Sequence, residues 1–214
     1  MNIKWIGHSC FLIEGKEGKV LTDPFKEEIP YSMPGTAVDV VTVSHEHFDH
    51  NAVDRVKGSP EIVRGDGPHT AAGITFQGVP SFHDEERGKK RGPNTIFLFT
   101  MESIRLAHFG DLGQPLTDAQ KMALSQVEAA FIPVGGHFTI GPDQAHDVIQ
   151  ALPKLKVVFP MHYKTNKLGS NFPIVPLDNF TRGMQNTRKI GRSEVALTRE
   201  LLPGQTEVWI LDYA

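Results

Sequence analysis

The sequence predicts a layered α/β fold formed by one domain. Apolar runs of strand length recur along the chain and are bounded by Gly, Pro or Asp, whereas few stretches keep a helical period. The 214 residues contain no internal repeat, no low-complexity segment and no linker long enough to separate two domains. We therefore assign residues 1–214 to a single domain with many strands and three or four helices.

The first strands form a predicted hairpin, followed by a strand that is buried on both faces. The hairpin joins Cys10–Ile13 to a run beginning at Val20, across a turn rich in Gly and Lys. After an irregular, proline-containing loop, Val38–Ser44 is almost continuously β-branched, as expected for a strand covered on both sides. This strand ends directly at His45.

Short apolar runs predict the later strands. They are Glu61–Arg64, Ile74–Val79, Thr95–Thr100, Ile104–Ala107, Val127–Val134, Val157–Pro160, Leu197–Leu202 and Glu207–Leu211. We expect the third and fourth of these to form a hairpin across Met101 to Ser103. We expect the last two to form a terminal hairpin around Pro203 and Gly204.

Capping residues predict the helices. Thr117 and Gln120 match a capping box that opens a helix extending to about Ser125. Asp143 can cap a second helix, which has one apolar stripe and is stopped by Pro153. A shorter helix is expected after Asn51.

Composition excludes several classes of protein. With 22 Lys+Arg against 25 Asp+Glu, the chain has no global charge that would attract nucleic acid or an anionic membrane. No run of about twenty apolar residues occurs, so we expect neither a signal peptide nor a membrane span. Cys10 is the single cysteine, which excludes an internal disulfide and makes a cytoplasmic location the expectation. The unusual feature is the ten histidines.

Four potential metal ligands follow the buried strand within six residues, namely His45, His47, Asp49 and His50. His45 and His47 are two apart and project to the same side, while the adjacent Asp49 and His50 can reach a second point. One segment can therefore serve two metal ions. Imidazole nitrogens and carboxylate oxygens suit zinc, and also manganese, iron or nickel. The alternative is a solvated, histidine-rich loop, but the full pattern is far more specific than a lone His-x-His.

The His-x-His-x-Asp-His pattern resembles the signature of the metallo-β-lactamase superfamily. The resemblance implies a four-layered αβ/βα sandwich with a two-metal site in the cleft between its sheets. Three later strands lead into residues that look like the remaining ligands of that family: His83, Asp111 and His162. The first metal would then be held by His45, His47 and His83, and the second by Asp49, His50 and His162. Asp111 would bridge the two.

The resemblance implies a metal-dependent hydrolase with two divalent ions, zinc first among them. A hydroxide bridged between the ions, formed because the pKa of bound water falls to roughly 7, would attack a small, anionic ester, lactone or phosphodiester. Asp49 is the candidate catalytic residue, since a carboxylate beside the nucleophile can orient it and pass its proton to the leaving group. Flavo-diiron members of the superfamily carry glutamate where His47 stands here, which favours hydrolysis over oxygen reduction.

Other features point to a branch and to substrate contacts. Gly7 to Phe11 and Pro160 to Tyr163 look like the branch that contains ascorbate-6-phosphate lactonase-like proteins and many hydrolases of unknown substrate. His8 and His137 each follow glycine near a strand end, where they can contact substrate, support a ligand or be structural loop residues. The flexible basic loop from Arg87 to Arg91 is either a solvated surface or an attractor of anionic substrates.

Two competing functions remain open. One is an RNA or DNA phosphodiesterase of the tRNA-processing type, which is disfavoured because the charge is slightly negative and no insertion is long enough for an RNA-holding arm. The other is a non-catalytic metal-binding regulatory scaffold, which the complete ligand set disfavours. We expect a small-molecule substrate and no membrane partner, and the sequence leaves the oligomeric state open, a homo-oligomer included.

Overall fold

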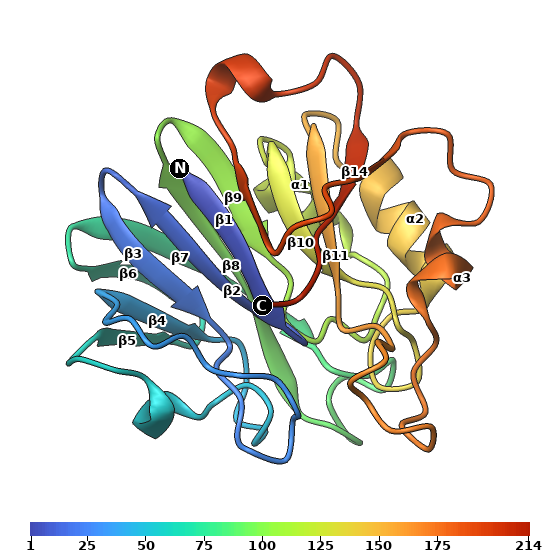
Figure 1. The fold of residues 1–214 in the computed structure, drawn as a ribbon. Helices are drawn as coiled ribbons and strands as arrows, with labels where there is room; N and C mark the ends of the chain where they lie inside the picture. Colours follow the sequence, from blue (N-terminus) through green and yellow to red (C-terminus); the bar gives the residue numbers. More distant parts are fainter.

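The computed structural model describes residues 1–214 and contains two β-sheets that face each other (Figure 1). The six-stranded sheet contains, in spatial order, β13 (Glu194–Ala196), β1 (Asn2–Gly7), β2 (Cys10–Gly15), β3 (Gly18–Thr22), β4 (Val40–Val43) and β5 (Glu61–Arg64). The eight-stranded sheet contains, in spatial order, β12 (Thr187–Lys189), β14 (Glu207–Ile210), β11 (Val157–Met161), β10 (Ala129–Pro133), β9 (Ile104–His108), β8 (Pro93–Met101), β7 (Ile74–Phe82) and β6 (Gly67–Ala71).

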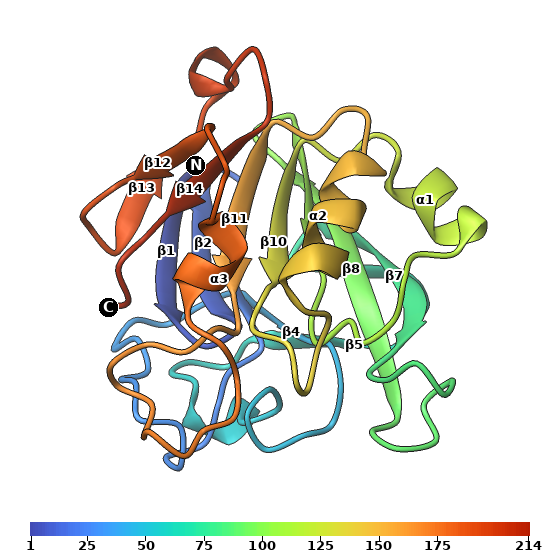
Figure 2. The same ribbon diagram turned by 90° about the vertical axis from the view of Figure 1, so that its right-hand side faces the viewer.

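The helices lie mainly on one side of this pair of sheets. They are α1 (Asp118–Leu124), α2 (Pro142–Gln150) and α3 (Leu177–Thr181), and they cover the outer face of the eight-stranded sheet (Figure 2). The helical segment between strands of the six-stranded sheet is a short 3-10 turn, η1 (Val53–Arg55). The architecture confirms the predicted α/β sandwich. No helix is long and apolar enough to cross a membrane.

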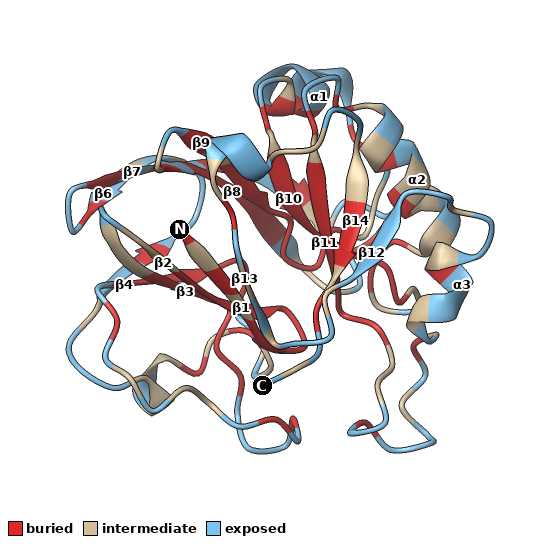
Figure 3. Cartoon of the chain, turned by 45° about the horizontal axis from the view of Figure 1, so that its top comes forward, coloured by how far each residue is buried: buried red, intermediate tan, exposed pale blue.

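The main core fills the space between the sheets, where buried residues concentrate on the strands (Figure 3). Strand β4 shows why its sequence is continuously apolar. Val40 packs into the core between the sheets, whereas Val41 and Val43 join a smaller cluster on the other face of the six-stranded sheet. Both faces of β4 are therefore covered, as its β-branched run predicts.

The predicted terminal hairpin is wrong. Leu197–Leu202 is not a strand, and its middle forms the 3-10 turn η2 (Arg199–Leu201). β14 instead pairs in parallel with β11, and β13, just before this segment, pairs antiparallel with β1. The end of the chain thus extends both sheets at their edges, and alternation of apolar residues cannot reveal which distant strand will be the partner.

The helix predictions hold in part. The capping box of α1 is confirmed, because the Thr117 hydroxyl accepts from Gln120 N–H and the Gln120 side chain accepts from Thr117 N–H. The prediction that Asp143 caps the second helix is wrong. α2 has Gly141 as its N-cap and Pro142 at its first position, because the fixed φ of proline suits that position. The helix expected after Asn51 is only the turn η1.

Candidate metal centre

The predicted ligands lie at one end of the sandwich, where strands of both sheets finish. β3 and β4 run in parallel, as do β9, β10 and β11, so their carboxyl ends meet at one edge of each sheet. The segments that follow β4, β7, β9 and β11 carry all the predicted ligands: His45, His47, Asp49, His50, His83, Asp111 and His162. The two sheets therefore contribute jointly to one site.

The first cluster contains His45, His47 and His83, whose ligand atoms all lie within 4.8 Å of one another. His45 and His83 are buried, and His47 is the most exposed of the three. Two imidazoles come from the segment after β4 and the third from the end of β7, across the cleft. This is the grouping that the family resemblance implies for the first metal.

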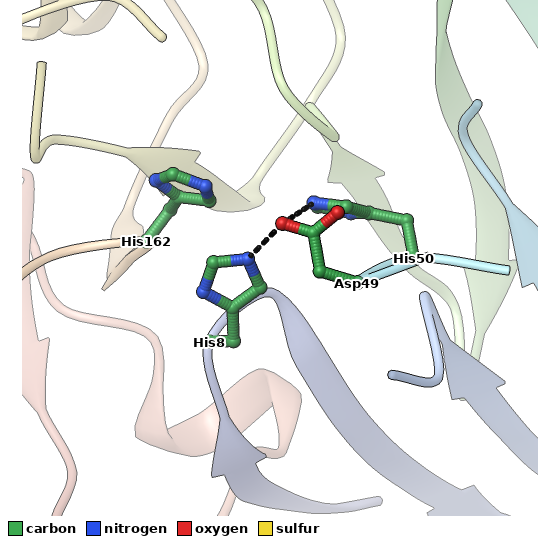
Figure 4. Close-up of side chains that lie close together, drawn as sticks. All are labelled: His8, Asp49, His50 and His162. Carbon is green, nitrogen blue, oxygen red and sulfur yellow. Dashed lines mark hydrogen bonds and ion pairs between the residues drawn. The ribbon is translucent and has the colours of Figure 1, made fainter. Parts of the chain in front are cut away.

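The second cluster contains Asp49, His50 and His162, and it also includes His8. His8 Nε2 donates to Asp49 Oδ2 at 3.1 Å, and the His8 ring lies 4.2 Å from that of His162 (Figure 4). The sequence left three interpretations of His8 open. The structure places its side chain inside the candidate centre, where it holds the Asp49 carboxylate.

Asp111 lies between the two clusters. Its Oδ2 is 3.2 Å from His83 Nε2 and 3.3 Å from His162 Nε2, and its Oδ1 is 3.3 Å from His50 Nε2. His45 Nε2 approaches the same carboxylate at 4.0 Å. The position of this one buried carboxylate agrees with the bridging role implied by the resemblance.

The unpartnered atoms of the centre test whether a metal fits. His45 Nε2, His50 Nε2 and Asp111 Oδ1 are all buried and have no hydrogen-bond partner. Buried polar atoms are nearly always satisfied, and lone pairs that converge without a donor are satisfied by a cation. The donor set of imidazoles and carboxylates fits zinc, and equally manganese, iron or nickel.

Asp23, at the end of β3, fixes the orientation of two of the imidazoles. Its Oδ2 accepts directly from His50 Nδ1–H at 2.8 Å. The same oxygen accepts from the Ser44 hydroxyl at 2.6 Å, and that hydroxyl in turn accepts from His45 Nδ1–H at 2.9 Å. Both imidazoles therefore carry their proton on Nδ1 and present the Nε2 lone pair to the centre. Sequence reasoning missed this role of Asp23. The role depends on the parallel pairing of β3 with β4, which places Asp23 beside Ser44 and which the apolar pattern does not indicate.

The loop that carries Asp111 is held by the backbone around it. Asn94 Oδ1 accepts from Asp111 N–H at 2.9 Å, and Asn94 Nδ2 donates to Phe109 O at 3.0 Å. Gly110 has φ of 54°, and a Cβ there would lie 2.4 Å from Asn94 Oδ1 and 2.5 Å from Ser44 Cβ. Only glycine allows the loop to approach this closely. His108, at the end of β9, donates from Nε2 to Ser9 O at 2.8 Å.

Burial and charge set the protonation of the centre. Burial lowers the pKa of His8 to about 4, so His8 is neutral at pH 7. Burial by itself lowers the pKa of His50, but the carboxylates of Asp111 and Asp49 outweigh it and raise that pKa well above the ordinary value, so the negative charge of the centre favours a cation at Nε2, either a proton or a bound metal ion. Burial by itself raises the pKa of Asp111, and His162 and His50 outweigh it, so the pKa of Asp111 lies well below the ordinary value. The bridging carboxylate is thus ionised at neutral pH.

The other predicted substrate contact, His137, does not reach the clusters. It is exposed, and it lines a hollow beside His83 together with Lys90 and Arg91 of the basic loop. A second hollow is lined by His45, His47 and also Arg91. The two hollows measure about 410 and 550 Å³, which is the size range of small-molecule sites.

Comparison with known proteins adds evidence of descent. A family model described as "Beta-lactamase superfamily domain" matches residues 2–162. A UPF0173 metal-dependent hydrolase from Methanoculleus marisnigri is 31% identical over 96% of each chain. Another from Thermococcus kodakarensis is 30% identical over 77% of this chain and 85% of its own length. The crystal structure of a proposed Zn-dependent hydrolase of the metallo-β-lactamase superfamily from Thermotoga maritima matches with a TM-score of 0.83 and 35% identity, covering 100% of this chain and 99% of that one.

Proposed function

Because the chain belongs to the metallo-β-lactamase superfamily, we propose that it is a metal-dependent hydrolase with two divalent metal ions. Zinc is the first expectation, and manganese, iron and nickel are the alternatives. One ion is held by His45, His47 and His83, the other by Asp49, His50 and His162, with Asp111 between them. The narrower likeness to ascorbate-6-phosphate lactonase-like proteins stays a prediction.

The observation that carries this proposal is the convergence on Asp111. Imidazole Nε2 atoms from His50, His83 and His162 lie within 3.3 Å of its carboxylate oxygens. Asp23 and Ser44 orient two of the neighbouring imidazoles so that their lone pairs face inward. A purely structural histidine cluster needs no second layer of groups that keeps lone pairs pointed at one spot.

The chemistry is hydrolysis of a small, anionic ester, lactone or phosphodiester. When bound, a pair of divalent ions lowers the pKa of water to about 7 and polarises the group under attack. The chain's own contribution is Asp49, whose Oδ2 is the atom that takes a proton from the attacking water and returns it to the leaving group. His8 donates to this oxygen and so fixes its direction. The hollows beside the first cluster are large enough for a small molecule.

Metal analysis combined with an activity screen tests the proposal. Protein purified without added metal is expected to hold up to two equivalents of a divalent ion by mass spectrometry. His47→Ala and His162→Ala are each expected to reduce the content by about one equivalent. His69→Ala is the matched control, because His69 lies on β6 outside both clusters and should leave metal content unchanged.

The screen then separates hydrolase from scaffold. Metal-restored protein is assayed on a panel of lactones, carboxylic esters and phosphodiesters, with and without chelator. Turnover that chelator abolishes, and that Asp49→Asn lowers at least a hundredfold because the amide keeps an oxygen ligand but is not a base, supports the proposal. Metal binding without chelator-sensitive turnover on any member would instead favour the regulatory scaffold, and activity confined to RNA would favour the tRNA-processing type.

A further inference from the structure

The basic loop after His83 is organised around one buried carboxylate. Asp84 is 4% exposed, and its two oxygens accept from four backbone N–H groups of the loop at 2.7 to 2.9 Å. The donors belong to Glu86, Gly88, Lys90 and Arg91. The sequence predicts a flexible basic loop, but the structure shows an ordered turn that is held by hydrogen bonds to the Asp84 carboxylate.

Backbone contacts close this turn. Gly92 N–H donates to Gly88 O at 2.9 Å, and His83 N–H donates to Gly92 O at 3.1 Å, so the turn is tied to a predicted metal ligand. A Cβ at Gly88, whose φ is 78°, would lie 2.9 Å from Gly92 O. The positions of the loop side chains relative to the metal centre are thus set by the backbone.

Charge pairing singles out one side chain of this loop. Three cations line the two hollows beside the first cluster: Arg64, Lys90 and Arg91. Arg64 pairs with Glu46, and Lys90 pairs with Glu86. Arg91 has no acidic partner and is the cation that lines both hollows.

The remaining acidic groups of the hollows are also engaged. Glu85 accepts from Gln144 Nε2 at 2.7 Å, and Asp66 accepts from the Thr95 hydroxyl at 3.1 Å. The Asp84 carboxylate is fully used by the backbone. None of these carboxylates forms an ion pair with the Arg91 guanidinium, so an anion entering the cleft meets an unpaired cation.

The Arg91 guanidinium is held in place by an aromatic ring. Its central carbon lies 5.5 Å from the centroid of the Phe138 ring, within the range of a cation–π contact. The Arg91 guanidinium makes no hydrogen bond to the protein, so its N–H donors are available to a planar or tetrahedral oxyanion. Arg91 is half-buried, which reduces screening by water.

We propose that Arg91 is the specificity-determining residue that binds an oxyanion, a carboxylate or a phosphate, carried by the substrate away from the bond that is broken. The proposal rests on the hydrolase function proposed above and names its substrate class. It assigns the recognition to one of the four cations of the loop and excludes Lys89, which lines neither hollow, and Lys90, which is already paired.

Matched esters test the proposal. The zinc-loaded protein is assayed on p-nitrophenyl half-esters of succinate, glutarate and adipate, against neutral p-nitrophenyl esters of the same chain lengths. Arg91→Gln is expected to lower kcat/KM for the best half-ester about tenfold or more, through KM, and to change the neutral ester less than twofold. Arg91→Lys should restore part of the loss. Lys89→Gln should change neither substrate.

The outcomes separate this proposal from the general one. Equal effects of Arg91→Gln on charged and neutral esters, or no effect on either, would overturn the role of Arg91 while leaving the hydrolase function standing. If no ester is turned over, calorimetric titration of glutarate and of inorganic phosphate into wild type and Arg91→Gln still tests the role of Arg91. A Kd that the substitution leaves unchanged for both anions overturns the proposal. A tenfold weaker Kd for one of them supports it and identifies the preferred oxyanion.

Discussion

Asp23→Asn tests the inference that a residue outside the ligand set controls the metal centre. The substitution preserves shape, but it replaces one carboxylate oxygen by an amide that can only donate. Although burial raises the pKa of Asp23, the nearby imidazoles of His108 and His50 outweigh it and hold that pKa below the ordinary value, so the native group is a carboxylate. Its Oδ2 accepts from both His50 Nδ1–H and the Ser44 hydroxyl.

The substitution is expected to weaken both metal binding and folding. With an amide N–H₂ facing it, His50 can keep a hydrogen bond only by moving its proton from Nδ1 to Nε2, the atom 3.3 Å from Asp111 Oδ1. A protonated Nε2 cannot ligate a metal. Affinity at the second cluster should fall about 10–100-fold, the usual effect of losing such a supporting bond. The free energy of unfolding of the metal-free protein should fall by about 1–3 kcal/mol.

The assay is competition with a chromogenic chelator, paired with urea unfolding of the metal-free protein. The matched control is Asp39→Asn, because Asp39 is exposed and its carboxylate accepts only from Lys19 N–H at the surface. It should change neither quantity, within about 0.5 kcal/mol for stability. If Asp23→Asn folds and binds two equivalents of metal as tightly as wild type, the tautomer argument is refuted.

Three further outcomes are expected. Gly7→Ala should lower the free energy of unfolding by about 3 kcal/mol or more, because φ at Gly7 is 134° and the new Cβ would lie 2.3 Å from the Tyr31 ring. Gly73→Ala, also at positive φ but in open space, should lower it by only about 1 kcal/mol. Urea unfolding of the two variants measures the difference. Burial raises the pKa of Tyr31 from 10.0 to about 12, so its contribution to stability, about 2.7 kcal/mol, is complete below pH 10 and lost as the pH rises toward 12. Tyr31→Phe should flatten that part of the stability profile, and an unchanged slope would contradict the assignment. Zinc at a hundred times its Kd should raise the free energy of unfolding by about 2.7 kcal/mol per site, and a chelator should reverse this increase. A melting curve that neither zinc nor chelator changes would argue against metal binding to the native state.

The sequence predicts most of the centre because its ligands are local to strand ends. His45 to His50 form one contiguous segment after an unmistakable strand, and each later ligand closely follows an apolar run. The family resemblance supplied their grouping, and the structure brings the same residues together. That they bind metal stays a prediction.

What the sequence could not supply depends on contacts between distant segments. Asp23 supports His50 only because β3 and β4 pair in parallel, and apolar patterning does not reveal that register. His8 reaches Asp49 through the bend after β1, a strand that we did not predict. The four bonds that Asp84 accepts depend on the loop's own conformation, which a run of basic residues does not indicate.

The division of the centre between two sheets has a consequence for the order of folding events. Each cluster draws two of its predicted ligands from the segment after β4 and the third from a strand of the opposite sheet, His83 in one case and His162 in the other. Neither sheet alone carries all three predicted ligands of either cluster. The complete predicted ligand set of each cluster therefore forms only when the two sheets dock, so we expect the rate of full metal uptake during refolding to report the completion of the tertiary structure and not the formation of either half.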